Sequence, residues 1–316
     1  MLGEPFDAFI RESPVAVMAA ATLERVFDAA RLERVFEEHA LRGYAKDLAF
    51  AACVTMMADV VFRAAKNVNN YYQSYPDRLG VSLKAVYDKL NRLEPAVAAG
   101  LVAYAAAELR PCLQAMPQAP GPFLAGLRVR VLDGNHLSGT EHRLGELRRS
   151  RQAALPGQAL VFYDPRYDLI EEVIPCEDAY TQERALLPEA LSRIAADECI
   201  IADRNFCTLG FSFGVADRRA CFVIRQHRRL PFVPTGPRVP AGTDERGRAV
   251  FEQPGVIEEP GTGRTLALRR ITVALETPTK DGHKELHVLT NLPVAQADAV
   301  QVAGLYRDRW TVESAF

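Results

Sequence analysis

The 316-residue sequence carries little excess charge of either sign, since 38 Lys and Arg against 40 Asp and Glu give a formal net charge of −2. The strongly basic balance common among DNA-binding proteins is therefore missing. Its six cysteines form no C-x-x-C pair, and its scattered histidines have no zinc-site spacing.

The longest apolar stretch, 48–62, contains Asp59 and is too short and polar to span a bilayer. Acidic residues precede the first apolar run, which is the wrong charge for a secretory signal. The composition predicts a cytoplasmic protein with buried, reduced thiols and no membrane partner.

Three acidic residues occupy positions that suit hard cations. Asp133 follows the apolar run 127–132 and Asp203 follows 199–202, which places each at or near the end of a predicted buried β-strand. Glu313 shares one helical stripe with Tyr306 and Arg309, because the three are spaced i, i+3 and i+7. Carboxylates bind Mg²⁺ or Mn²⁺ in preference to soft metals. A single Asp after a strand is more often a turn or N-cap residue, and such a stripe is more often an ion-paired surface.

Several short motifs surround these acids and extend the pattern across the chain. They are VLDGN at 131–135, EHRL at 141–144, ALPG at 154–157, FYDP at 162–165, EDAY at 177–180, IADRNF at 201–206 and the final Tyr-x2-Arg-x3-Glu. Two more, YAKDLAF at 44–50 and VYDKLNRLEP at 86–95, lie nearer the N-terminus. In order and approximate spacing, this set resembles the bacterial DDE transposases of the insertion-sequence 4 type.

The resemblance implies a catalytic domain in which Asp133, Asp203 and Glu313 hold two Mg²⁺ ions, with Mn²⁺ as a substitute. Two such ions, about 3.5–4 Å apart, can activate an attacking water or 3′-hydroxyl and stabilise the leaving oxygen of a phosphodiester. Asp133 is the expected bridging ligand. Tyr306 and Arg309 resemble the phosphate-contacting pair of the family, and Arg309 can form a planar fork onto a phosphate. Two further DNA contacts are predicted after the second Asp, at Arg204 and Arg225.

The N-terminal part of the sequence predicts helices. Residues 1–110 are rich in Ala, Leu and charge, lack strand-like alternation, and are predicted to form a helical DNA-recognition region. Ser82 is the predicted N-cap of a helix that reaches Leu90, which suits either a DNA-reading helix-turn-helix or plain bundle packing. A Pro- and Gly-containing linker is predicted at 111–124, and the catalytic domain at 125–316.

The catalytic region predicts an α/β fold with a mixed sheet. Strands are predicted at 127–132, 159–163, 169–174, 199–202, 220–225 and 286–290, with helices at 181–196, 209–217 and after Pro293. This is the element order of a ribonuclease-H-like fold. Residues near 226–285 are dense in Gly and Pro but contain short strands at 249–251 and 266–275, which favours a β-rich insertion. In the resembling family this insertion contacts DNA near the reacting end; a plain surface excursion is the alternative.

The sequence thus predicts a DNA transposase that cuts transposon ends and joins the 3′-hydroxyl to target DNA. It would act as a homodimer on DNA, in the bacterial cytoplasm and associated with the nucleoid. The family motif continues to a Lys seven residues after the Glu, whereas this sequence stops at Phe316, so we expect a catalytic domain truncated in its last helix that cleaves slowly. Two other functions stay open: a metal-dependent nuclease of the same fold, and a truncated, non-catalytic end-binding inhibitor.

Overall fold

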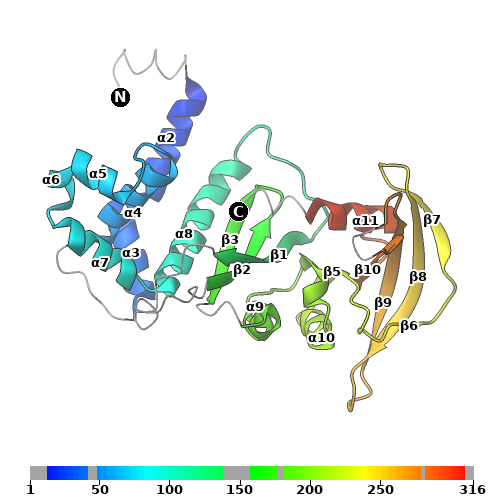
Figure 1. Ribbon diagram of the computed structural model, residues 1–316. Coiled ribbons are helices and arrows are strands. Elements are labelled where there is room, and N and C mark those ends of the chain that lie inside the picture. Colours follow the sequence, from blue (N-terminus) through cyan, green and yellow to red (C-terminus); the bar gives the residue numbers. More distant parts are fainter. Residues whose placement is uncertain (1–12, 42–47, 138–156, 177–180, 279–281, 310–316) are drawn as a thin grey trace. The chain divides into compact units, whose positions relative to one another are not determined.

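The computed structural model describes residues 13–41, 48–137, 157–176, 181–278 and 282–309 (Figure 1). The chain divides into two compact units, Met1–Ala119 and Pro120–Phe316. The predicted ligand Glu313 and the motif at 141–144 lie outside the described residues.

Every described element of the first unit is a helix, as predicted. The helices are α2 (Pro14–Val26), α3 (Ala29–His39), α4 (Phe50–Val61), α5 (Val68–Ser74), α6 (Pro76–Leu79), α7 (Leu83–Arg92) and α8 (Pro95–Gln114). Ser82 caps α7 as predicted, since its hydroxyl accepts a hydrogen bond from the backbone N–H of Ala85 at 3.2 Å. Two apolar clusters hold the unit together, one around Met56 and Tyr71 and the other around Leu32 and Phe50.

Helix α8 differs from the prediction, because it continues to Gln114 where a linker was expected from residue 111. Pro111 removes only one N–H donor from the last turn, so the apolar pattern before it can carry the helix further. Among the described helices, α8 is also long and apolar enough to cross a membrane by length and composition. It packs against α2 and α3, and 17% of its apolar window is buried.

The second unit is built on one mixed sheet with the strand order β3-β2-β1-β4-β5-β10-β9-β8-β6, and β7 pairs with β8. The first five strands are β1 (Arg128–Leu137), β2 (Gly157–Asp164), β3 (Leu169–Cys176), β4 (Glu198–Ala202) and β5 (Cys221–Arg225). Strands β1, β2 and β3 pair antiparallel, whereas β1, β4 and β5 pair parallel. This arrangement confirms the predicted ribonuclease-H-like fold.

Helices cover both faces of this sheet, and the two faces have separate apolar cores. On one face α9 (Leu187–Ser192) and α10 (Leu209–Asp217) pack over Leu132 and Ile200. On the other, α11 (Ala299–Asp308) packs over Val131 and Ile201 (Figure 1). Because side chains alternate along a strand, Asp133 lies on the same face as Val131, which is the face of α11.

The predicted β-rich insertion is present, and it extends the same sheet. Its strands are β6 (Val233–Pro234), β7 (Val239–Thr243), β8 (Ala249–Glu258) and β9 (Thr265–Ala274), followed by β10 (Glu285–Thr290). Strands β8 and β9 pair antiparallel from Val250 to Glu258, and β9 joins the main sheet through β10 (Figure 1). The sequence did not predict β6 and β7, which are short and contain Pro or Gly.

The helix predicted at 181–196 forms two shorter pieces. The two pieces are a 3-10 helix, η2 (Glu183–Leu186), and the α-helix α9. A separate 3-10 helix, η3 (Arg204–Phe206), follows β4. Pro188 stands in the first turn of α9, where its missing N–H costs little because that N–H would have no partner within the helix. In a continuous helix from Thr181, Pro188 would lie in the interior and one backbone hydrogen bond would be lost.

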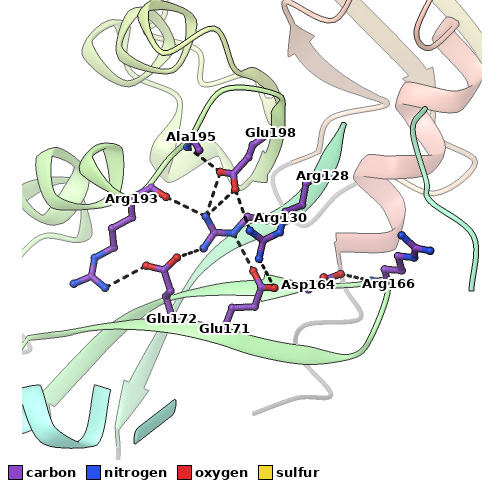
Figure 2. Close-up of polar contacts among 9 residues, drawn as sticks. All are labelled: Arg128, Arg130, Asp164, Arg166, Glu171, Glu172, Arg193, Ala195 and Glu198. Carbon is purple, nitrogen blue, oxygen red and sulfur yellow. Dashed lines mark hydrogen bonds and ion pairs between the residues drawn. The ribbon is translucent and has the colours of Figure 1, made fainter. Parts of the chain in front are cut away.

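A buried network of charges fixes β1 against its neighbours on the face of α9 (Figure 2). The Arg130 side chain is 1% exposed, and its guanidinium pairs with Glu198 Oε2 at 3.2 Å and Glu171 Oε2 at 3.1 Å. Glu172 Oε1 pairs with it at 2.5 Å, and the ring of Phe162 lies 4.1 Å from the guanidinium carbon. Arg128 also pairs with Glu171 and Glu198, and Arg193 pairs with Glu172, so three cations face three carboxylates, as buried ions need to be tolerated.

All six cysteines are free thiols, as predicted from the lack of C-x-x-C pairs. Cys53, Cys199 and Cys207 are buried, and burial raises the pKa of both the Cys53 and the Cys207 thiol to about 11. The expectation of fully buried thiols is wrong for the other three, which are half-buried: Cys112, Cys176 and Cys221.

Candidate active site

The two predicted aspartates lie next to each other at the carboxyl end of β4. Leu132 of β1 pairs with Ala202 of β4, so the next residues, Asp133 and Asp203, leave the parallel pairing at the same level. Asp203 directly follows β4, as predicted, and caps η3 by accepting from Asn205 N at 3.2 Å. Asp133 is not at a strand end, because β1 continues to Leu137 by pairing with β2 alone.

The end of α11 brings a cation to Asp133. Arg309 Nη1 donates to Asp133 Oδ2 at 3.0 Å, with the two side chains 5% and 15% exposed. Helix α11 starts at a capping box in which Asp298 and Gln301 bond to each other's backbone, which sets its first turn over the sheet. The buried side chains Val302 and Leu305 pack its apolar stripe onto the α11 face, and Arg309 is thereby directed at β1.

The Asp133 carboxyl is crowded by other negative charges. Burial raises its pKa above the usual range, and the charges of Asp203 and Glu183 raise it further. The Arg309 guanidinium and a hydrogen bond from the backbone N–H of Gly134 oppose this rise in pKa. The predicted metal ligands Asp133 and Asp203 are therefore close enough to interact electrostatically.

Tyr306 and Arg225 join the same group of residues. The Tyr306 side chain is buried, and burial raises its pKa, whereas Arg309 and Arg225 lower it and Asp203 raises it. The Arg309 guanidinium lies 5.9 Å from the centre of the Tyr306 ring. The structure thus gathers Asp133, Asp203, Tyr306, Arg309 and Arg225. Arg204, the remaining predicted DNA contact, is exposed beside them and directly follows Asp203.

Glu183 is a member of this group that the sequence did not predict. A methyl group on Gly134 would lie 2.3 Å from Glu183 Oε1, so this carboxylate rests directly over the backbone next to Asp133. Glu183 Oε2 accepts from Asn205 Nδ2 at 3.4 Å, which links η2 to η3. The EDAY motif ends three residues before Glu183, but it does not indicate a site residue at that position.

The donor set suits a hard divalent cation, because it consists of carboxylates whose mutual repulsion an ion would relieve. Among residues 13–309, with the gaps noted above, no three His, Cys, Asp or Glu side chains are placed to hold a metal ion together. The third predicted ligand, Glu313, comes four residues after Arg309 in the sequence and lies outside the described residues.

Comparison with protein families identifies the family of the chain. The family model described as "Transposase DDE domain" matches residues 125–316, which is more than half of the chain. The chain belongs to this transposase family. The predicted enzyme class, a DDE transposase, is confirmed at this level, and proteins of the family generally use divalent metal ions. The finer assignment to the insertion-sequence 4 type is compatible with the match and stays a prediction.

Among solved structures, the chain is similar to the piggyBac transposase in a cryo-EM structure of its synaptic complex with hairpin DNA. The similarity has a TM-score of 0.42 at 10% sequence identity, and it covers 93% of this chain and 66% of that chain. No curated protein matches the chain.

Proposed function

We propose that this DDE transposase cleaves phosphodiesters at transposon ends and joins the resulting 3′-hydroxyl to target DNA. The observation that carries the proposal is the placement of Asp133 and Asp203 side by side on parallel strands, with Arg309 bonded to Asp133. Two carboxylates for cations and one guanidinium for a phosphate are the groups that phosphoryl transfer requires, because its catalysis consists mainly of positioning and charge stabilisation.

Asp133, Asp203 and Glu313 would hold two Mg²⁺ ions, with Mn²⁺ as a substitute. When bound, such ions lower the pKa of the attacking oxygen and stabilise the leaving one. The raised pKa of Asp133 supports this role, since a carboxyl that burial and neighbouring anions disfavour as an ion gains from a nearby cation.

The basic residues and Tyr306 would position the DNA strand. Arg309 is held with its guanidinium at Asp133, and a scissile phosphate at this point would compete for the same planar fork. Tyr306 would bring its hydroxyl beside that phosphate. Arg204 and Arg225 would contact the neighbouring backbone, where side-chain cations supply affinity and register without reading sequence.

The DNA partners would be the inverted-repeat ends of a transposon and the target duplex. The helical first unit would recognise the ends, and its best candidate is α7, on which Lys84, Tyr87 and Asn91 form one exposed stripe. Two copies would pair two ends as a homodimer on DNA, in the bacterial cytoplasm. The exposed stripe supports DNA reading by α7, and strand transfer requires the pairing of ends.

A strand-transfer assay tests the proposal. Labelled duplexes carrying the inverted repeats that flank the gene are incubated with the chain, a supercoiled plasmid and Mg²⁺ or Mn²⁺. We expect labelled ends joined to the plasmid and no joining by Asp133→Asn. Ends that are only hydrolysed would identify a nuclease. Ends that are bound but never cut, in either metal, would identify a non-catalytic end-binding protein, and both results overturn the proposal.

A further inference from the structure

The 3-10 helix η2 contacts both segments that carry a predicted metal ligand, through the two oxygens of one carboxylate. Glu183 Oε1 rests against the backbone of Gly134, where an added methyl group would lie 2.3 Å from this oxygen and 2.8 Å from the carboxyl carbon. Gly134 is not among the glycines with a positive φ, so the close approach and not the backbone angle requires a residue without a side chain. Oε2 of the same carboxylate accepts from Asn205 Nδ2 at 3.4 Å. Glu183 thus bridges β1, next to Asp133, and η3, next to Asp203.

Asn205 connects Glu183 to the carboxylate of Asp203. Its backbone N–H donates to Asp203 Oδ1 at 3.2 Å, and its side-chain amide donates to Glu183. Its carbonyl oxygen accepts from Arg184 Nε at 2.7 Å, so two consecutive residues of η2 hold it. A displacement of η2 would therefore move Asn205 and, with it, the donor that orients the Asp203 side chain.

The helix η2 is itself anchored at both ends. The Gln158 side chain is buried in β2, the neighbour of β1, and its amide donates to the carbonyl of Thr181, two residues before Glu183. Leu187, directly after η2, is buried in the apolar core on the face of α9. Because both ends of η2 are fixed, the Glu183 carboxylate has a defined position over β1.

The charge of Glu183 has no evident use in folding. The contacts of its carboxylate are an amide and a glycine backbone, neither of which carries charge. After burial, which contributes most, its charge is among the causes that raise the pKa of Asp133. A third carboxylate beside Asp133 and Asp203 therefore costs stability until a cation binds. Among the described residues no three such side chains are placed to hold a metal ion together, which favours a role for Glu183 in positioning the ligands over a role as a ligand.

We propose that Glu183 is a positioning residue of the cation site, which holds the two aspartates at a fixed separation. It acts on Asp203 through Asn205. Its contact with Gly134 acts on the strand at Asp133. The proposal rests on the proposed transposase function and adds a residue to its site. Replacing a residue that orients metal ligands in this way typically costs about 10–100-fold in metal affinity or activity.

Mn²⁺ binding by the whole chain, measured without DNA by electron paramagnetic resonance of the free ion, tests the proposal. Two substitutions disturb Glu183 without changing the charge of the chain. Asn205→Ala removes the amide from which Oε2 accepts, and Gly134→Ala puts a methyl group where Oε1 lies. Gly210→Ala is the matched control, since no other part of the described chain lies within 4 Å of a methyl group added there. Asn205 is exposed, so Asn205→Ala keeps the fold even if Gly134→Ala does not.

We expect Asn205→Ala and Gly134→Ala each to weaken Mn²⁺ binding roughly tenfold, and the control to leave it unchanged. In a Glu183→Ala background neither change should add more than about twofold, because the carboxylate through which both act is gone. A purely structural contact would instead lower the free energy of unfolding and leave the affinity of the folded chain as it is. Wild-type affinity in either variant, or losses that persist in full in the Glu183→Ala background, would overturn the proposal.

Asp133→Asn separates this proposal from the transposase function on which it rests. If Asp133→Asn binds Mn²⁺ like the wild type, the assignment of the cation site is wrong, and the positioning role is wrong with it. If Asp133→Asn loses binding while Asn205→Ala keeps it, the cation site is right and only the role of Glu183 is wrong.

Discussion

Arg309 donates a 3.0 Å hydrogen bond to Asp133, although the two residues are 176 positions apart in the chain. The bond joins the end of α11 to the middle of β1, and it places a permanent cation beside the carboxyl predicted to bridge two metal ions. The same guanidinium can pair with a carboxylate or with a phosphate, and it cannot form its full fork with both at once. Substrate binding is therefore expected to redistribute the contacts of Arg309.

Arg309→Ala should reduce end cleavage by about 10²–10³-fold, because a positioned donor to the reacting phosphate is lost. End binding should weaken much less, since one arginine supplies only part of a large electrostatic footprint. Arg309→Lys should rescue cleavage poorly, because an ammonium cannot reproduce the planar fork. Single-turnover cleavage and anisotropy measure the two effects; full rescue by Lys would show that only the charge at this position matters.

Arg130→Ala should lower the free energy of unfolding by about 3–5 kcal/mol, the usual cost of removing one partner from a buried ion network. Glu171 and Glu198, with side chains 5% and 6% exposed, would keep only the half-exposed Arg128 as an ion-pair partner among those the network shows. Urea unfolding followed by circular dichroism measures the loss. Arg264→Ala, which breaks an exposed pair, is the control and should shift the midpoint little. Equal midpoints for the two variants would mean that the network contributes nothing to stability.

Protonation of His287 should make the fold less stable in mild acid. Burial lowers its pKa first, then the charges of Arg270, Arg238 and His283, while Glu285 raises it and Thr272 bonds to its Nδ1 at 2.9 Å. Because the pKa in the folded chain lies below the ordinary value of about 6.5, the unfolded chain binds the proton more readily. Stability from this group is fully present above pH 6.5 and is lost as the pH falls below it.

The measurement compares the unfolding free energy of the wild type and His287→Gln between pH 8 and pH 5. The wild type should lose more stability than the variant on acidification, since the contribution of every other titrating group is shared by both chains. Parallel curves for the two chains would show that His287 is not coupled to folding.

The parts of the fold that the sequence predicted are those in which a local pattern has one physical cause. The run 199–202 is apolar at every position because β4 is covered on both faces, and all its residues are buried. Asp133 and Asp203 were predicted to share one site through the family resemblance, and the parallel pairing of β1 with β4 places them side by side. Helix α11 and its stripe of Tyr306 and Arg309 followed from helical spacing alone.

Other features had no local pattern that could predict them. Arg130, Glu171 and Glu198 are charged residues, which normally lie on a surface, and only the packing of β1, β3 and β4 brings them together in the interior. Glu183 of η2 lies against the backbone of Gly134, next to Asp133, a contact set by the tertiary structure. The continuation of β1 to Leu137 depends on its pairing with β2, which comes later in the chain.

Single-turnover cleavage of a transposon-end duplex by Asp133→Asn, Asp203→Asn and Glu313→Gln, in Mg²⁺ and in Mn²⁺, tests the central claim most directly. Replacing a carboxylate with an amide keeps the shape but weakens cation binding. Asp217→Asn, an exposed aspartate paired with Arg264, is the matched control. We predict that the three site variants cleave at least about 10²–10³-fold more slowly than the wild type and the control, with end binding in EDTA unchanged. A normal cleavage rate for Asp133→Asn or Asp203→Asn would contradict the assignment of these carboxylates as the metal-holding site.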